Sequence, residues 1–237
     1  MKKYRALLFD LDDTIFDFTT GEEVALTEVC EKYSSISDIE QIKNTYRKIN
    51  KKLWHDFENN EISKDYLINN RFSLTFAQLG MEVDGLAVAQ EYQQLLGKQC
   101  QLLPEAENTL KTLQDAGFDL YAVTNGYEIT QKSRIALAQI GHYFKAIYIS
   151  EQTGSKKPEI AFFDYVFEHS QEINKTEAMI IGDSISSDIQ GGLNIGIDRV
   201  WYNRHLTDDQ PDATYIVQNH KQLLQVFQKQ VKEGAIL

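Results

Sequence analysis

The chain has 237 residues, of which 42% are hydrophobic and 25% are charged, and its formal net charge at pH 7 is −11. This composition is ordinary for a globular protein, and a total of 3 prolines argues against disordered linkers. The acidic excess excludes a broad basic face, so we expect neither nucleic acid nor an anionic membrane as a partner. A small anionic substrate remains compatible with this charge if a few cationic groups gather around it.

The chain carries no pattern of a secreted or membrane protein. Its first residues are basic, but the apolar run that follows ends at Asp10, which is too short for a signal-peptide core. No stretch approaches the roughly 20 apolar residues that span a membrane. Cys30 and Cys100 lie far apart and match no metal-binding or redox spacing. We therefore expect a cytoplasmic protein with reduced thiols.

The first predicted strand covers residues 4–10 and ends in a group of acidic residues. Asp10 and Asp12 stand two positions apart, and Asp13 and Thr14 follow directly. Two carboxylates this close repel each other unless a cation lies between them. Acids at the C-terminal end of a buried strand also stand where open α/β sheets bind their ligands. The stretch therefore predicts a metal site.

The segment from residue 17 to residue 100 shows helical patterns and no convincing strand. Its apolar residues recur every three or four positions, which is typical of helices that bury one side. Ser63 has the position of a helix cap. Helices joined by short turns predict a small antiparallel bundle, which is either a scaffold insertion or a lid over the acidic stretch. The predicted helices cover approximately residues 20–32, 39–57, 64–79 and 84–96.

Strands and helices alternate after residue 101, which predicts a parallel sheet with right-handed crossovers. Pro104 is expected at the first position of a helix that Gly117 ends. We predict an α/β fold, with a Rossmann-like parallel-sheet core of residues 1–16 and 101–237 and an inserted four-helix-bundle cap of residues 17–100. The other predicted helices of the core are residues 127–140, 159–169, 187–194 and 220–232, and its strands are residues 118–123, 146–149, 178–181, 199–202 and 214–217, the last at an edge.

The strands of a parallel sheet point their C-terminal ends to the same edge, so the polar residues that follow them should converge. Carboxylates without histidine or cysteine companions suit a hard cation such as Mg²⁺. The Thr124 hydroxyl and the N–H groups of Asn125 and Gly126 are suited to a phosphate oxygen, and Lys157 would neutralise the same anion. The converging residues are Asp10, Asp12, Thr124, Asn125, Lys157, Asp183 and Asp188.

These residues belong to motifs that follow one another in a definite order. One motif alone would be weak evidence, because threonine, asparagine and aspartate also cap helices. Together they resemble the motifs of the haloacid dehalogenase (HAD) superfamily, in its branch of aspartate-nucleophile phosphatases. The resemblance covers essentially the whole chain, since the predicted helical insertion is similar to the family's cap. The motifs are Asp10-Leu11-Asp12-Asp13-Thr14, Thr124-Asn125-Gly126, Lys157-Pro158 and Gly182-Asp183-Ser184-Ile185-Ser186-Ser187-Asp188.

The resemblance implies a role for each matching residue. Asp10 would be the nucleophile that forms an aspartyl-phosphate, and Asp12 would protonate the leaving group and then activate water. Mg²⁺ would be held by the Asp10 carboxylate, the Asp12 backbone carbonyl and Asp183. Asp188 would lie behind these ligands and orient metal-bound water. The residues that would hold the phosphoryl group are Thr124, Asn125 and Lys157.

Within the superfamily the chain looks most like the pyrimidine 5′-nucleotidases, because of its Asp-Leu-Asp-Asp-Thr-Ile-Phe-Asp-Phe opening and its Gly-Asp-Ser-x-x-Ser-Asp motif. This similarity implies a nucleoside monophosphate substrate such as UMP, dUMP or dTMP, with the base chosen by the cap. A sugar-phosphate phosphatase or a phosphoglucomutase-like enzyme remains an alternative. Dehalogenase and phosphonatase chemistry is disfavoured because neither needs Asp12. A phospho-accepting receiver module without turnover is an alternative of another class.

A few further residues need a prediction of their own. Lys156 and Lys157 are adjacent, and the family lysine directly precedes the proline, which selects Lys157. We expect Asp13 to cap the local loop rather than to bind metal. Arg71 is a candidate substrate contact, although an arginine of this kind is more often solvated. The histidines are scattered at no ligand spacing and are expected to be structural or solvent-exposed: His55, His142, His169, His205 and His220.

Overall fold

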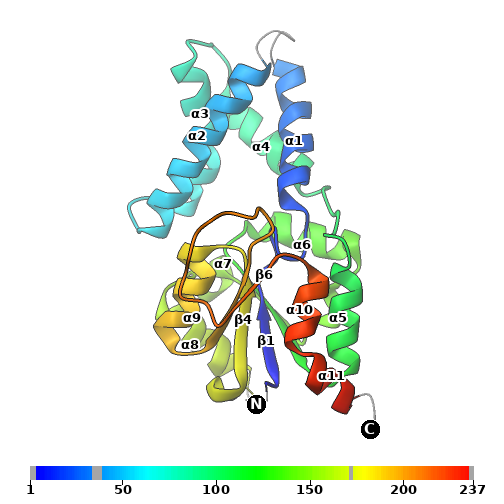
Figure 1. Cartoon of the computed structure of the whole chain (residues 1–237). Coiled ribbons are helices and arrows are strands. Elements are labelled where there is room, and N and C mark those ends of the chain that lie inside the picture. Colours follow the sequence, from blue (N-terminus) through cyan, green and yellow to red (C-terminus); the bar gives the residue numbers. More distant parts are fainter. Residues whose placement is uncertain (1–3, 34–38, 171–172, 235–237) are drawn as a thin grey trace. The chain divides into compact units, whose positions relative to one another are not determined.

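The protein is represented by a computed structural model that describes residues 4–33, 39–170 and 173–234 (Figure 1). The chain divides into two units. One comprises Met1–Phe18 and Cys100–Leu237, and the other is Thr19–Gln99. Among the described helices, none is long and apolar enough to cross a membrane.

The first unit, called the sheet-based unit below, is built on a six-stranded sheet in the order β3-β2-β1-β4-β5-β6. All neighbouring strands pair in parallel, so the predicted parallel-sheet fold is confirmed. The register pairs Phe9, the last residue of β1, with Ala122 of β2 on one side and Ile181 of β4 on the other. The strands are β1 (Ala6–Phe9), β2 (Asp119–Thr124), β3 (Ala146–Ile149), β4 (Ala178–Gly182), β5 (Asp198–Tyr202) and β6 (Tyr215–Val217).

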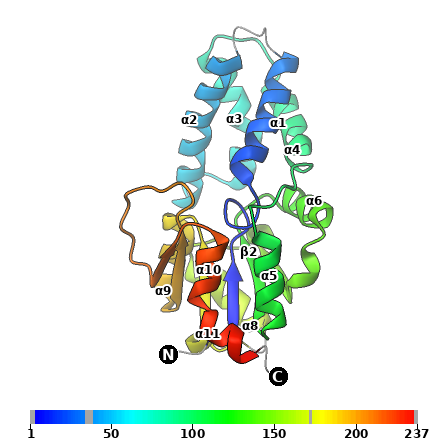
Figure 2. The same cartoon turned by 45° about the vertical axis from the view of Figure 1, so that its right-hand side comes forward.

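Helices cover both faces of this sheet, as a parallel sheet requires. Successive residues of β1 serve opposite faces, so Leu7 and Phe9 join one hydrophobic cluster and Leu8 joins the other. Helices α5 and α10 pack on the face that carries Leu7 and Phe9 (Figure 2), and α8 packs on the face that carries Leu8. The helices are α5 (Ala106–Asp115), α6 (Glu128–Ala138), α7 (Ser150–Thr153), α8 (Ile160–His169), α9 (Gln190–Ile195), α10 (His220–Val226) and α11 (Gln228–Gly234).

The second unit is helical and is held together by an aromatic centre. The Tyr46 and Phe72 rings stack with centroids 4.7 Å apart, and Tyr92 lies 5.2 Å from Phe72. Arg71 is buried against this centre, with its guanidinium 4.7 Å from the Tyr92 ring, so the expectation of a solvated arginine is wrong. Ser63 caps α3 as predicted. The helices are α1 (Phe18–Tyr33), α2 (Ile39–Glu58), α3 (Lys64–Gln78) and α4 (Gly85–Leu96).

Three local predictions for the first unit need correction. Pro104 is not the first residue of a helix, because α5 begins at Ala106 after Glu105, whose φ of 66° is left-handed. The single helix predicted over residues 220–232 is two helices in the structure, α10 and α11, with Phe227 between them. The segment after β4 begins with a π-helix, η4 (Ile185–Ile189), before α9 continues it. Apolar periodicity does not detect such breaks, because it continues across them.

Both connections to the helical unit leave the first unit side by side. The Leu103 N–H donates to the Ile15 carbonyl at 2.9 Å, and the Asp17 N–H donates to the Gln101 carbonyl at 2.9 Å. Phe16 and Leu102 form an antiparallel bridge between these two bonds. The outgoing and returning segments of the chain are thus hydrogen-bonded to each other at the point where they leave this unit.

Candidate active site

The site begins where β1 ends, at the centre of the sheet. Asp10 follows Phe9 directly, and its N–H donates to the Ile181 carbonyl of β4 at 2.9 Å. Because β2 and β4 flank β1, Asp10 lies between Thr124, the last residue of β2, and Asp183, the first residue after β4. From β1 the chain adds β2 and β3 on one side of the sheet and then β4, β5 and β6 on the other side. Open α/β sheets form a ligand-binding crevice where the strand order reverses in this way.

Three carboxylates gather at this point. Oxygen atoms of Asp10, Asp183 and Asp188 all lie within 4.8 Å of one another. Asp188 is fully buried, and one of its oxygens accepts a hydrogen bond from the Ser184 N–H at 3.1 Å. Gly182 makes this approach possible, because a Cβ at that position would lie 2.2 Å from the Asp188 oxygen. The motif after β4 therefore places two carboxylates beside Asp10.

Lys157 lies among these carboxylates and is 1% exposed. Its ammonium donates to Asp10 Oδ1 and to Asp188 Oδ1, each at 2.6 Å, and to the Val123 carbonyl at 2.8 Å. The Asn125 amide holds this loop by accepting from the Lys157 N–H at 3.0 Å and donating to the Lys157 carbonyl at 2.8 Å. The neighbouring Lys156 pairs with Glu159 instead.

The electrostatics of this group favour a bound cation. Burial raises the pKa of the Asp10 carboxyl to about 8 against the opposing effect of Lys157, and the charges of Asp188 and Asp12 raise it further. Burial and the neighbouring carboxylates also raise the pKa of Asp183 well above its ordinary value. Oxygen donors with an excess negative charge suit a hard divalent cation, so the donor set fits Mg²⁺.

Asp12 turns to a different set of partners, on helix α6. One of its carboxylate oxygens accepts from the Gln131 amide at 2.8 Å, and the other accepts from the Arg134 guanidinium. The same Gln131 amide donates to Thr124 Oγ at 3.0 Å. The Gly126 N–H, which we expected to serve phosphate, also donates to Thr124 Oγ at 3.0 Å. The Thr124 hydroxyl thus accepts twice, which leaves its own proton to donate to a ligand.

Gln131 and Arg134 escaped the sequence analysis, although α6 carries a signal. The helix buries Thr130, Gln131 and Arg134, while Ile129 is 70% exposed and Leu137 is 53% exposed. An amphipathic helix normally does the reverse. Helix α6 thus departs from the usual amphipathic pattern directly after one of the four motifs, and such departures are typical of functional sites.

A second arginine holds the loop that follows Asp12. Arg204 contacts the carboxylate of Asp13 and donates to Asp17 Oδ1 at 2.9 Å. Asp13 itself has a left-handed φ of 53°. The structure thus gives Asp13 an arginine partner that sequence reasoning did not foresee, because Arg204 follows it by 191 positions.

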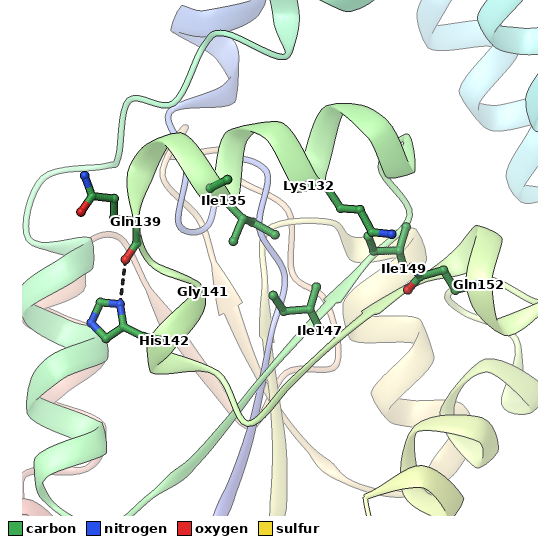
Figure 3. A pocket seen from close by; sticks show the side chains of 9 residues that line it. Lys132, Ile135, Gln139, Gly141, His142, Ile147, Ile149 and Gln152 are labelled. Atoms are coloured by element: carbon green, nitrogen blue, oxygen red, sulfur yellow. Dashed lines mark hydrogen bonds between the residues drawn. The ribbon is translucent and has the colours of Figure 1, made fainter.

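A separate hollow of about 460 Å³ lies beside α6 and β3 (Figure 3). Ile135, Ile147 and Ile149 give it an apolar lining, and His142 at its rim contacts the Gln139 carbonyl through Nδ1 at 2.7 Å. None of the predicted site residues lines it. The hollow is therefore distinct from the carboxylate cluster.

A family model described as haloacid dehalogenase-like hydrolase matches residues 7–202. This chain belongs to the haloacid dehalogenase-like hydrolases. The match includes both the sheet-based unit up to the end of β5 and the whole helical unit. The resemblance drawn from the four sequence motifs is thereby confirmed.

Two relatives named as pyrimidine 5′-nucleotidases match nearly the whole chain. The pyrimidine 5′-nucleotidase PynA of Streptococcus pneumoniae is 41% identical over 232 residues, which cover 97% of this chain and 98% of that protein. The pyrimidine 5′-nucleotidase YjjG of Escherichia coli is 29% identical, with 96% and 99% covered.

Solved structures give the same picture for the fold. The HAD-hydrolase YfnB from Bacillus subtilis, bound to magnesium, superposes with a TM-score of 0.87 at 36% identity, with 95% of this chain and 99% of that chain covered. The L-2-haloacid dehalogenase from Xanthobacter autotrophicus has a TM-score of 0.74 at 18% identity, with 95% and 98% covered, and shares the fold.

Proposed function

We propose that this HAD hydrolase is a magnesium-dependent phosphomonoesterase that hydrolyses pyrimidine nucleoside 5′-monophosphates. The observation that carries the chemistry is the convergence of Asp10, Lys157 and the Asp183–Asp188 pair at one strand end. The observation that supports the substrate class is the similarity to two pyrimidine 5′-nucleotidases over almost the full length of the chain. Phosphoryl transfer requires positioning and charge neutralisation, and these residues supply both.

In the first step, an Asp10 carboxylate oxygen attacks phosphorus in line with the ester oxygen that leaves. The P–O bond to the nucleoside breaks, and the departing 5′-oxygen takes a proton from Asp12. The products of this step are the free nucleoside and an aspartyl-phosphate on Asp10. Thr124 donates a hydrogen bond to a phosphoryl oxygen, where charge accumulates. Lys157 exchanges one of its three contacts, to Asp10, Asp188 or the Val123 carbonyl, for a second phosphoryl oxygen.

In the second step, water cleaves the intermediate. Asp12, now ionised, takes a proton from the water as its oxygen attacks phosphorus. The bond between phosphorus and the Asp10 oxygen breaks, which releases inorganic phosphate and restores the carboxylate. Asp12 ends the cycle protonated, so protons and electrons balance over one turnover.

Asp10, the Asp12 backbone carbonyl and Asp183 are the groups that we propose hold Mg²⁺, with Asp188 behind them. The chemistry that Mg²⁺ supplies when bound is charge neutralisation of the carboxylates and the phosphate. Lys157 contributes a fixed positive charge in the same place. Burial alone would lower the pKa of Lys157, but Asp10 and Asp188 raise it above its ordinary value, so the ammonium stays charged.

We also propose that residues 17–100 form the cap of this enzyme, and that the cap chooses the base. The groups that we propose for the sheet-based unit bind the phosphate and the metal. Every phosphate monoester has the same phosphate, so these groups cannot distinguish one nucleotide from another. Discrimination between UMP, dUMP or dTMP and purine nucleotides therefore has to come from other residues. The helical unit is the part of the chain that remains for this task.

A phosphate-release screen tests the proposal. Nucleoside monophosphates and sugar phosphates are incubated with the full chain and Mg²⁺, and inorganic phosphate is measured. We expect pyrimidine monophosphates to be preferred over purine monophosphates by about tenfold or more, a difference that about 1.4 kcal/mol explains. Preference for a sugar phosphate would support the alternative phosphatase instead. A single stoichiometric phosphorylation without continued release would support the receiver-like alternative.

A further inference from the structure

We infer that Gln131 and Arg134 are positioning residues that fix the Asp12 carboxylate for proton transfer to the leaving group. The inference rests on the proposed function, because it assigns these two residues a part in the step that Asp12 performs. Neither residue belongs to the four motifs. Both come from α6, which follows the Thr124 motif, so one helix connects the proposed acid–base residue to the proposed phosphate-binding hydroxyl.

The three side chains form a closed set of contacts. Gln131 donates to Asp12 Oδ2, and Arg134 donates to Asp12 Oδ1 and to the Gln131 amide oxygen, the latter at 3.1 Å. Gln131 therefore has both ends of its amide engaged, which fixes its orientation. With both carboxylate oxygens held from α6, Asp12 cannot rotate without breaking at least one of these hydrogen bonds. Each oxygen keeps a second lone pair, and the proton for the leaving group is carried on one of these.

The burial of Arg134 distinguishes these contacts from those of a mobile surface arginine. The side chain is 1% exposed, and its guanidinium lies 4.2 Å from the Phe16 ring. A buried guanidinium is costly unless charged and polar partners surround it, and here Asp12 is its acidic partner. Gly126 leaves room for the arrangement, because a Cβ there would meet the Gln131 amide nitrogen at 2.2 Å.

The contact to Thr124 gives the arrangement a mechanistic consequence. The Gln131 amide nitrogen donates to both Asp12 and Thr124, so the proton-transferring carboxylate and the phosphate-binding hydroxyl keep a fixed separation. Proton transfer to the leaving oxygen requires such a fixed geometry, and small displacements cost large factors in rate. Loss of Gln131 should therefore weaken leaving-group protonation more than phosphate binding.

The experiment compares two substrates that differ in their need for an acid. A nucleoside monophosphate releases an alkoxide, which must be protonated as it leaves, whereas 4-nitrophenyl phosphate releases a stable phenolate. We compare kcat/KM because it reports the steps up to loss of the leaving group. For Gln131→Met, we expect a loss of roughly 100-fold with the alkyl ester and a loss at least about tenfold smaller with the aryl ester.

Two further variants make the test specific. Arg134→Lys keeps a cation beside Asp12 and should recover most of the activity that Arg134→Met loses. Lys132→Met, at an exposed position of the same helix, is the matched control and should keep the wild-type ratio between the two substrates. Circular dichroism and thermal melting show which variants fold, and Gln131→Met keeps the test available if loss of the buried arginine prevents folding.

The outcomes separate this inference from the proposed function. An equal loss on both substrates in Gln131→Met, or no loss, would overturn the positioning role while the enzyme remains a phosphatase. If the wild type prefers another alkyl phosphate, that ester replaces the nucleotide and the comparison stands. Absence of phosphate release from every ester by the wild type would refute the proposed function itself, and this inference with it.

Discussion

The buried histidine of α10 makes the stability of the sheet-based unit depend on pH. His220 is fully buried, and its Nε2 lies 3.0 Å from the Thr14 carbonyl. Because a carbonyl can only accept, Nε2 carries the proton and Nδ1 is bare. Nδ1 is buried and has no hydrogen-bond partner among the described residues. A second proton would therefore place an unpaired N–H and a charge in the core.

The size of the effect follows from the pKa. Burial lowers the pKa of His220 from 6.5 to about 4, although the Thr14 carbonyl acts in the opposite direction. The unfolded chain thus binds this proton below about pH 6.5, and the folded chain does so only near pH 4. The contribution of His220 to the free energy of unfolding is therefore fully present above pH 6.5, and it is lost as the pH falls toward 4. One pKa unit is worth about 1.4 kcal/mol, so the complete loss is about 3 kcal/mol, of which about 2 kcal/mol appears by pH 5.

Urea unfolding at several pH values between 8 and 5 measures this loss. A Trp54→Phe background leaves Trp201 of β5 as the fluorescent reporter of the sheet-based unit. His220→Gln in the same background removes the titrating group and keeps an amide that can donate to Thr14. Subtracting the two pH profiles cancels the titration of the carboxylates. A chelator throughout prevents metal binding from contributing.

We expect the free energy of unfolding of the wild type, relative to His220→Gln, to fall by about 2 kcal/mol between pH 8 and pH 5. His169→Gln, a change at an exposed position, measures the effect of replacing a histidine at the surface. Parallel profiles for the wild type and His220→Gln would show that the core tolerates the charged ring, and the reasoning from burial would fail.

Three other predictions concern the proposed chemistry. Asp10→Asn should reduce phosphate release to the buffer background with an unchanged circular dichroism spectrum, and steady turnover in this variant would exclude Asp10 as the nucleophile. EDTA should stop phosphate release and Mg²⁺ should restore it and raise the melting temperature, whereas full activity after thorough chelation would remove the metal from the mechanism. Lys157→Met should lower kcat/KM by about 100-fold or more, while Lys156→Met should stay near the wild type because its ammonium pairs with Glu159, and equal losses would contradict the assignment.

The fold could be predicted because its signals are local. Buried strands of a parallel sheet read as short apolar runs, and β3 has the predicted bounds of Ala146–Ile149. The motif residues could be grouped because parallel strands end at one edge, and Asp10, Asp183 and Asp188 do lie together. The metal and phosphate roles of these residues remain predictions.

The contacts of Asp12 could not be predicted, because they depend on which side of α6 faces the sheet edge. Gln131 and Arg134 are three residues apart, a spacing that equally fits a solvated helix surface. The left-handed residue Glu105 and the break at Phe227 were missed for a related reason. Tertiary packing decides these features, and a single sequence records packing only indirectly.

The paired connections at Asp17 and Gln101 bear on how proteins of this kind can diversify. The outgoing and returning segments bond to each other at 2.9 Å, as the two arms of a hairpin do. The inserted helices therefore take the place of a hairpin tip. Such tips accept long replacements at little cost to the surrounding structure. A different set of helices could be exchanged at this point while β1 and the carboxylates at its end stay in register. If the helical unit chooses the base, as we propose, substrate selectivity can change there while the residues proposed for phosphoryl transfer stay unchanged.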